Sequence, residues 1–153
     1  MPVMSVVREK APELSRGSFS RRCQPETESA GRVLVVDDEP VQLRCIRRIL
    51  QGDWRVDTAV GAIAAASLLA AGRYDVVITD YNMPEYDGVW LLEQVQRLYP
   101  TTRRVLISGS GEELFSPHVR SGLIQRFLAK PAAADAVLDS LRGHATGREV
   151  DRV

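Results

Sequence analysis

The sequence predicts a doubly wound α/β domain built on a five-stranded parallel sheet. Short runs of β-branched residues and leucine alternate five times with segments whose apolar residues recur at helical spacing, which is typical of repeated strand–helix units. Several runs are apolar at every residue, as expected of strands covered by helices on both faces. Connections of this kind are right-handed, so all the strands should point the same way.

The composition is that of an ordinary globular domain. Hydrophobic residues make up 44% of the 153 residues, and 20 basic residues balance 20 acidic ones, so net charge gives no argument for a nucleic acid or membrane partner. Cys23 and Cys45 lie too far apart to indicate a disulfide framework or a zinc site, and we expect Cys45 to pack on a helix. The sequence shows neither a signal peptide nor a membrane span, so a cytoplasmic protein is expected.

Three regions differ in composition. Residues 1–31 are poor in aromatic residues and rich in Ser, Arg, Glu and Pro, which predicts a disordered N-terminal extension. Residues 32–142 carry the alternating pattern and should form the folded domain. Residues 143–153 should form a flexible polar tail, and because so few residues follow the last predicted helix, we expect a stand-alone domain without an output domain.

The first two strand–helix units are clearly marked. Val33–Val36 is an apolar strand, and Pro40 then suits the first turn of a helix, where its missing N–H costs nothing. Gly52 ends that helix. Trp54–Ala59 is the second strand, and Ala62–Ala71 is an Ala- and Leu-rich helix bounded by glycines.

The third unit begins with the buried strand Tyr74–Asp80. Asp87 is a favourable N-cap for a helix whose apolar face is formed by Leu91, Leu92, Val95 and Leu98.

The last two units are shorter. Val105–Ile107 is a strand that ends at Ser108, and the weakly helical residues 112–122 are interrupted by Pro117. Ile124–Ala129 is the fifth strand. The last helix has an apolar face formed by Ala134, Val137, Leu138 and Leu141.

Polar side chains follow four of the five strands. They are Asp37, Asp38 and Glu39 after the first strand, Asp80 after the third, Ser108 after the fourth and Lys130 after the fifth. In a parallel sheet these carboxyl ends share one edge, which is where ligands bind in open α/β folds. The sequence therefore brings acids, a hydroxyl and an ammonium group to one place.

This set of groups suits phosphoryl chemistry. Clustered carboxylates repel one another, and oxygen ligands without His or Cys favour a hard ion such as Mg²⁺. Lys130 could pair with a phosphoryl oxygen and Ser108 could donate a hydrogen bond to one, while a carboxylate that attacks phosphorus forms an aspartyl phosphate. Helix capping would explain one of the acids but not three; Glu39 is the one expected to be a cap or a solvated neighbour.

The chain resembles the receiver domain of two-component response regulators, including the small chemotaxis-type and phosphorelay regulators. The resemblance rests on four segments in this order: VLVVDDEP (33–40), DVVITDYNMPEYDGVWLL (75–92), VLISGS (105–110) and FLAKP (127–131). It covers about residues 32–142. It implies a flavodoxin-like fold with the strand order 2-1-3-4-5.

The resemblance also implies a role for each site residue. Asp80 would be the phosphoacceptor. Asp38 would bind Mg²⁺ directly, Asp37 would bind it largely through water, and the backbone carbonyl of Asn82 would be a further ligand.

Three other positions match the family. Ser108 would hydrogen-bond the phosphoryl group after a shift of its loop, and Lys130 would pair with phosphoryl oxygens. The peptide bond between Lys130 and Pro131 is usually cis in the family. Phe127 occupies the aromatic switch position, although an aromatic residue on a strand is just as well explained as core.

The function implied is phosphorylation-dependent signalling. A sensor histidine kinase or a histidine phosphotransfer protein would phosphorylate Asp80, and the output would be contact with an unknown protein target or onward phosphotransfer. The chain would not be an enzyme beyond catalysing its own phosphorylation and dephosphorylation. We expect no direct nucleic acid binding and no membrane insertion, and a homodimer is compatible with this function.

Three alternatives compete with this interpretation. A phosphatase of the haloacid-dehalogenase type needs an acidic residue at position 82, where the chain has Asn. A flavodoxin-like nucleotide binder would have its phosphate repelled by the acids of the first loop, and no P-loop is present. A degenerate receiver that binds proteins constitutively stays open at this point.

Overall fold

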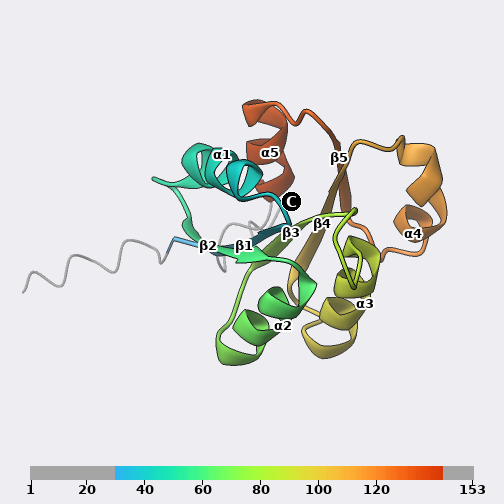
Figure 1. Cartoon of the computed structure of the whole chain (residues 1–153), viewed down its shortest axis with the longest axis horizontal. Coiled ribbons are helices and arrows are strands. Elements are labelled where there is room, and N and C mark those ends of the chain that lie inside the picture. The colour runs from blue at the N-terminus through green and yellow to red at the C-terminus, as the bar shows by residue number, and fades with distance from the viewer. Residues whose placement is uncertain (1–29, 143–153) are drawn as a thin grey trace, which may run out of the picture.

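Five parallel strands form a single sheet in the order β2-β1-β3-β4-β5 (Figure 1). The strands are β1 (Arg32–Asp37), β2 (Arg55–Val60), β3 (Val76–Asp80), β4 (Arg103–Ser108) and β5 (Arg126–Ala129). The helices are α1 (Pro40–Leu50), α2 (Ala62–Ala71), α3 (Gly88–Leu98), the 3₁₀ helix η1 (Glu112–Phe115), α4 (Ser116–Arg120) and α5 (Ala134–Leu141). The predicted fold class and strand order are confirmed.

This computed structural model describes residues 30–142. The expectations for the N-terminal extension and the C-terminal tail fall outside this range, apart from the last two residues of the extension. Gly31 is buried, and its carbonyl accepts a hydrogen bond of 3.0 Å from the backbone N–H of Arg55, so this residue belongs to the folded domain rather than to the predicted extension. Within residues 30–142, no helix is long and apolar enough to cross a membrane.

Helices cover both faces of the sheet. Figure 1 shows α1 and α5 on one side and α2 and α3 on the other. Because side chains alternate along a strand, Val33 and Val35 pack beneath α1 and α5, whereas Leu34 and Val36 pack on the side of α2 and α3. All four are at most 1% exposed, which explains why the first strand has no polar face.

Two expectations about individual helix residues are wrong. Cys45 lies on α1 but is exposed, because the side of α1 that faces the sheet is formed by Leu43, Ile46 and Leu50. Leu98 is 56% exposed. It is the last residue of α3 and borders an open cavity of about 480 Å³ between the ends of α2 and α3.

The expected interruption near Pro117 is present. The predicted weak helix divides into η1 and α4, and Pro117 stands in the first turn of α4, where proline is tolerated. The turn before it is a 3₁₀ helix, whose tighter winding is common at helix ends.

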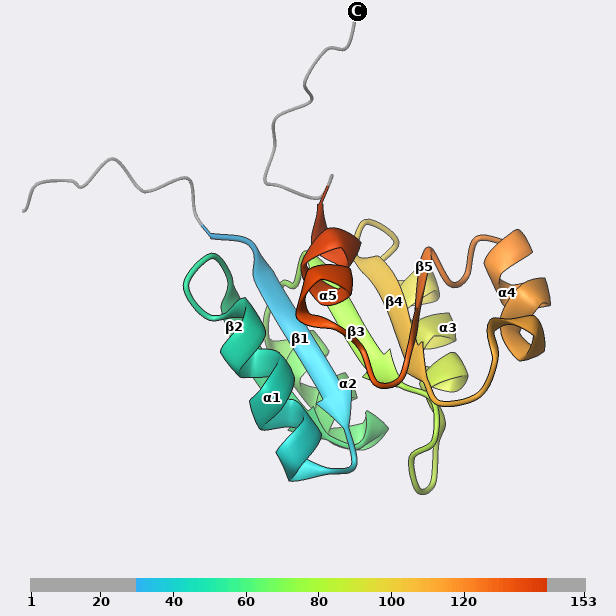
Figure 2. The same ribbon diagram turned by 90° about the horizontal axis from the view of Figure 1, so that it is seen from above.

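The amino ends of the strands are rich in arginine. Arginine is the first residue of β1, β2, β4 and β5, and Arg73 stands shortly before β3. In Figure 2 these ends lie opposite the edge at which the strands deliver their acids. These arginines outnumber the acids at the same ends, which are Asp53, Asp57 and Asp75.

Arg104 on β4 is buried, although the sequence predicted that this strand begins only at Val105. Its side chain donates to the backbone carbonyls of Leu123 (2.9 Å), Gly122 (3.0 Å) and Thr102 (3.3 Å), and burial lowers its pKa. The hydrogen-bond acceptors of this guanidinium are therefore backbone carbonyl groups. Two of them belong to the connection between α4 and β5, so Arg104 links that connection to the sheet.

A polar network joins the amino ends of β1, β2 and β3. Asp57 accepts hydrogen bonds from the Tyr74 hydroxyl (2.8 Å) and from the Arg32 guanidinium (2.7 Å). These contacts, that of Tyr74 first, hold the pKa of Asp57 below its ordinary value, although partial burial acts in the opposite direction. Burial and the hydrogen bond to Asp57 raise the pKa of Tyr74 to about 12.

We predict that Tyr74→Phe destabilises the protein by about 1.5 kcal/mol at neutral pH, because it deletes one hydrogen bond to an ionised carboxylate whose side chain is 40% exposed. A lowered folded-state pKa stabilises the protein above the unfolded value of about 3.9, and this contribution is lost as pH falls through the folded pKa. The difference between the two proteins should therefore shrink in acid. Urea unfolding at several pH values measures it, and Tyr86→Phe, at a residue that is 42% exposed, is the control. A pH-independent difference would contradict this explanation.

Candidate functional site

The carboxyl ends of β1 and β3 bring three carboxylates together. Asp37 is the last residue of β1, Asp38 follows it, and Asp80 is the last residue of β3. Each offers an oxygen atom, and these atoms all lie within 4.8 Å of one another. Asp37 and Asp80 are 2% and 6% exposed, whereas Asp38 is the most accessible of the three. The predicted meeting of these residues is confirmed.

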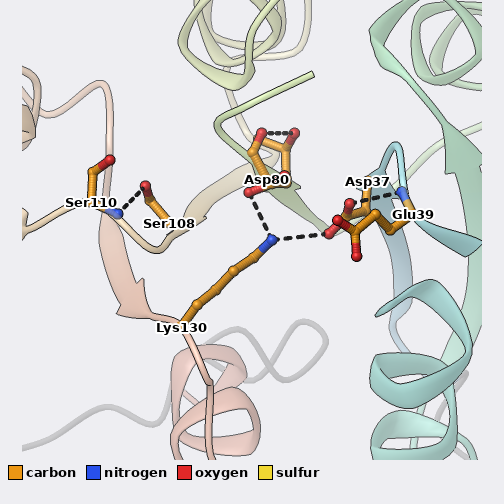
Figure 3. Close-up of polar contacts among 7 residues, drawn as sticks. Asp37, Glu39, Asp80, Ser108, Ser110 and Lys130 are labelled. Carbon is orange, nitrogen blue, oxygen red and sulfur yellow. Dashed lines mark hydrogen bonds and ion pairs between the residues drawn. The ribbon is translucent and has the colours of Figure 1, made fainter. Parts of the chain in front are cut away.

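Lys130 completes this cluster and reaches it from the end of the outermost strand, β5. It directly follows β5, and its backbone N–H is held by the Ser108 carbonyl at 2.9 Å. Figure 3 shows its ammonium group between two carboxylates, with Nζ 3.0 Å from Oδ1 of Asp80 and 3.4 Å from Oδ2 of Asp37. The peptide bond between Lys130 and Pro131 is cis, as the resemblance implied.

Burial and like charges raise the free energy of this cluster. Burial, the charge of Asp80 and a contact with Asp38 raise the pKa of Asp37 to about 6, against the lowering effects of the Glu39 N–H and Lys130. For Lys130, burial lowers the pKa, but the hydrogen bond to Asp80 and the charge of Asp37 outweigh it, so the pKa is raised overall. Lys130 therefore stays protonated at neutral pH.

The donor set suits a hard divalent cation. Three carboxylates face one ammonium group, which leaves an excess negative charge of about two when all are ionised. Every donor is an oxygen atom, and one carboxylate is open to solvent, so an ion could enter with part of its water shell, as Mg²⁺ prefers. These residues therefore fit a magnesium ion.

Glu39 has a different place. It stands at the N-cap of α1, but its side chain makes no capping hydrogen bond and it is exposed. Its backbone N–H donates to Oδ1 of Asp37 at 3.0 Å. Glu39 is thus the solvated neighbour that the sequence suggested, and its backbone fixes the orientation of Asp37.

Asn82 lies in the loop between β3 and α3. Together with Asp38 it lines an open cavity of about 390 Å³ beside the carboxylates. This position is compatible with the carbonyl ligand that the resemblance implies.

Ser108 reaches the same edge but does not contact the charged groups. It is the last residue of β4 and 1% exposed. Its Oγ accepts a hydrogen bond of 3.0 Å from the Ser110 N–H, and Figure 3 shows the hydroxyl directed toward Ser110 rather than Asp80. The loop that carries Ser108 would have to rearrange before this hydroxyl could reach a group on Asp80.

Phe127 belongs to an aromatic row that the sequence did not reveal. Its ring centroid lies 5.5 Å from that of Phe115, which in turn packs edge-on against Tyr81 at 4.8 Å. Phe115 is 1% exposed, and Phe127 is half-buried against the same core. The row connects the residue after Asp80 to η1 and β5. No local signal identifies such a row, because its members lie in three separate elements.

Gly88 lies directly behind the backbone of Asp80. A Cβ at Gly88 would overlap the carbonyl oxygen of Asp80 and lie 2.9 Å from Cδ1 of Leu106. Asp87 accepts a hydrogen bond from the Trp90 N–H at 2.8 Å, which confirms the predicted cap. The start of α3 thus lies directly against the backbone of Asp80.

Comparisons with known proteins agree with this geometry. Residues 33–142 match the response regulator receiver domain family. The hydrogenase transcriptional regulatory protein HoxA of Cupriavidus necator is 34% identical over 112 residues, which are 72% of this chain and 23% of that protein. The chain thus spans about a quarter of the length of such curated relatives.

Solved structures with a similar fold include two receiver proteins. The signal receiver domain of an HD domain-containing protein from Pseudomonas fluorescens superposes with a TM-score of 0.69 at 30% identity, covering 76% of this chain and 87% of that one. The chemotaxis response regulator CheY4 of Vibrio cholerae gives a TM-score of 0.69 at 25% identity, covering 76% and 99%.

We predict that Gly88→Ala destabilises the protein by about 1–3 kcal/mol, because α3 must move away from Asp80 to admit a methyl group. Urea unfolding measures this loss. Gly109→Ala is the matched control, since a Cβ there meets no atom within 4 Å, and it should change stability by less than about 0.5 kcal/mol. Equal stability of the two variants would show that the contact with Asp80 is not restrictive.

We also predict that Asp38→Ala weakens Mg²⁺ binding about tenfold or more, equivalent to about 1.4 kcal/mol, whereas Ser108→Ala changes it little. Asp38 belongs to the carboxylate cluster, and Ser108 does not contact it. Calorimetric titration with Mg²⁺ compares the two variants. Coincident titration curves would remove Asp38 from the set of ligands.

Proposed function

The chain belongs to the response regulator receiver domain family of two-component signalling, and from this premise we propose that Asp80 accepts a phosphoryl group with the help of Mg²⁺. The donor is a sensor histidine kinase or a histidine phosphotransfer protein. The observation that carries the proposal is the position of the Asp80 carboxylate, next to Asp37 and Asp38 and 3.0 Å from the Lys130 ammonium.

Asp37, Asp38 and Asp80 would hold the metal ion through carboxylate oxygens, together with the backbone carbonyl of Asn82. When bound, Mg²⁺ supplies positive charge that offsets the negative charge of the carboxylates and of the incoming phosphoryl oxygens. Asp38 is the exposed member of the cluster, which suits it to direct binding. The buried Asp37 already accepts the Glu39 N–H, which suits it to binding through water.

The transfer is a displacement at phosphorus. A carboxylate oxygen of Asp80 forms a bond to phosphorus while the N–P bond of the phosphohistidine breaks, and the electron pair of that bond stays on the imidazole nitrogen. The product is an acyl phosphate on Asp80, and water later displaces the carboxylate and releases inorganic phosphate. The chain thus catalyses only its own phosphorylation and dephosphorylation and acts on no other substrate.

Lys130 stabilises charge at both stages. Its ammonium bridges Asp80 and Asp37 before the reaction, which reduces the repulsion between these two carboxylates. After the transfer it can turn from these oxygens to the phosphoryl oxygens, which carry more negative charge. Because its pKa is raised, it remains a cation throughout.

The signal is a shift between two conformations. The phosphoryl group adds negative charge and new acceptor oxygens beside Ser108, whose hydroxyl would exchange Ser110 for the phosphoryl group. The row of Tyr81, Phe115 and Phe127 borders the segment that would then move. The output is a change in protein–protein contact. The stand-alone character of the receiver stays a prediction from the sequence.

We predict that acetyl phosphate with Mg²⁺ adds about 80 Da, the mass of one HPO₃ group, to the wild type and nothing to Asp80→Asn. Intact-protein mass spectrometry measures the adduct. Lys130→Met, which keeps the length of the side chain, should remain folded but label more slowly, and circular dichroism checks the fold.

A different outcome would favour the degenerate receiver. If the wild type stays unmodified at several Mg²⁺ concentrations and donor concentrations, Asp80 is not a phosphoacceptor and the chain acts as a constitutive binding module.

A further inference from the structure

Exposed apolar side chains gather around the acidic edge of the sheet. Among residues 30–142, six large hydrophobic side chains are exposed. Five of them lie at or after the carboxyl ends of the strands, and they are Val41, Val60, Ile63, Tyr86 and Leu114. The sixth, Leu98, lies at the opposite end of the domain. Scattered exposed hydrophobic residues are normal, but a group at one edge marks an interaction surface.

Two of these residues line a defined groove, which we call the β2–α2 groove. It has a volume of about 480 Å³ and lies between the start of α2 and the loop that follows Asp80. Val60, Ala62, Ile63 and Pro84 supply apolar lining, and Asp38 and Glu85 supply carboxylates. Val60 and Ile63 are 57% and 52% exposed, so their side chains can be covered by a partner.

The backbone of Glu85 is also unusual. Its φ is 70°, in the left-handed region that residues with a Cβ seldom adopt. Such conformations concentrate at functional sites. Here the backbone places an acidic residue at the rim of an apolar groove.

We propose that the β2–α2 groove docks the protein that donates the phosphoryl group, which inserts an apolar side chain flanked by a basic residue. This inference rests on the proposed phosphorylation of Asp80. The apolar lining favours an apolar occupant, and the carboxylate of Glu85, which lies outside the Asp37–Asp38–Asp80 cluster, favours a neighbouring cation.

The continuity of the groove with the acidic cluster points to the donor rather than to an output partner. Asp38 belongs both to the groove and to the carboxylate cluster. A protein seated there also covers the approach to Asp80, as a phosphohistidine donor must. An output partner has no need to reach the acceptor residue, and a small donor such as acetyl phosphate has no need of the groove.

The experiment compares two phosphodonors. Wild type, Val60→Asp, Ile63→Asp and Leu98→Asp are phosphorylated with acetyl phosphate and, separately, with each autophosphorylated histidine kinase and phosphotransfer protein encoded in the source genome. Leu98 is the matched control, because it is 56% exposed and remote from the site. We expect the groove variants to lose about tenfold or more in kcat/KM with the protein donor that labels the wild type fastest. Acetyl phosphate should label all four proteins within about twofold of one another.

Two further variants separate docking from a local change in charge. Ile63→Gln adds no charge near Asp38, and it should still slow transfer from the protein donor. Glu85→Gln should weaken that transfer and make it less sensitive to salt, since one attractive charge is removed.

The possible results have different meanings. If Val60→Asp, Ile63→Asp and Ile63→Gln accept phosphoryl groups from the protein donor as the wild type does, the docking proposal is wrong. It is equally wrong if acetyl phosphate labels the wild type and none of the protein donors does. If acetyl phosphate fails to label the wild type, the proposed function itself fails, whatever the groove variants do.

Discussion

Repulsion between carboxylates at one edge of the sheet is the constraint on which the rest of the structure depends. Asp37 and Asp80 are held almost out of water beside Asp38, and a single ammonium group, that of Lys130, opposes them. Ions placed in this way lose several kcal/mol of hydration each. The cluster therefore carries an excess of negative charge, which suits it to bind a cation. A bound cation and Lys130 could then together neutralise the charge of a phosphoryl group.

The surrounding fold resists the relaxation that this repulsion favours. The strands that carry Asp37 and Asp80 are adjacent and parallel, with both faces covered by helices. Gly88 lets α3 begin against the backbone of Asp80, and Ser108 holds the backbone of Lys130. Asp80, the carboxylates of β1 and Lys130 thus come from segments that cannot move apart independently. By contrast, the Ser108 hydroxyl is held only by its own loop.

The sequence predicted the elements and the site well, because both depend on local signals. These signals are the spacing of apolar residues and the polar residues that directly follow the strands. Asp37, Asp38, Asp80 and Lys130 meet as expected, since a parallel sheet gathers its carboxyl ends at one edge. Features that depend on distant contacts were missed. In the sequence, Arg104 looks like a solvent-exposed residue, yet its side chain is buried and donates hydrogen bonds to three backbone carbonyl groups. Cys45 is exposed because its side of α1 faces away from the sheet.

The arginines at the amino ends of the strands have a consequence for encounters in solution. The formal net charge is zero, but within residues 30–142 the carboxyl ends of the strands carry an excess of acids over Lys130, and the amino ends carry an excess of arginines over Asp53, Asp57 and Asp75. The molecule is therefore an electric dipole, and a charged protein that approaches it exerts a torque before any atoms touch. A basic surface will be met by the end that bears Asp80, and an acidic surface by the end that bears the arginines. A protein with no net charge can therefore still orient an approaching charged partner. Added salt would weaken this orientation, because it screens the charges.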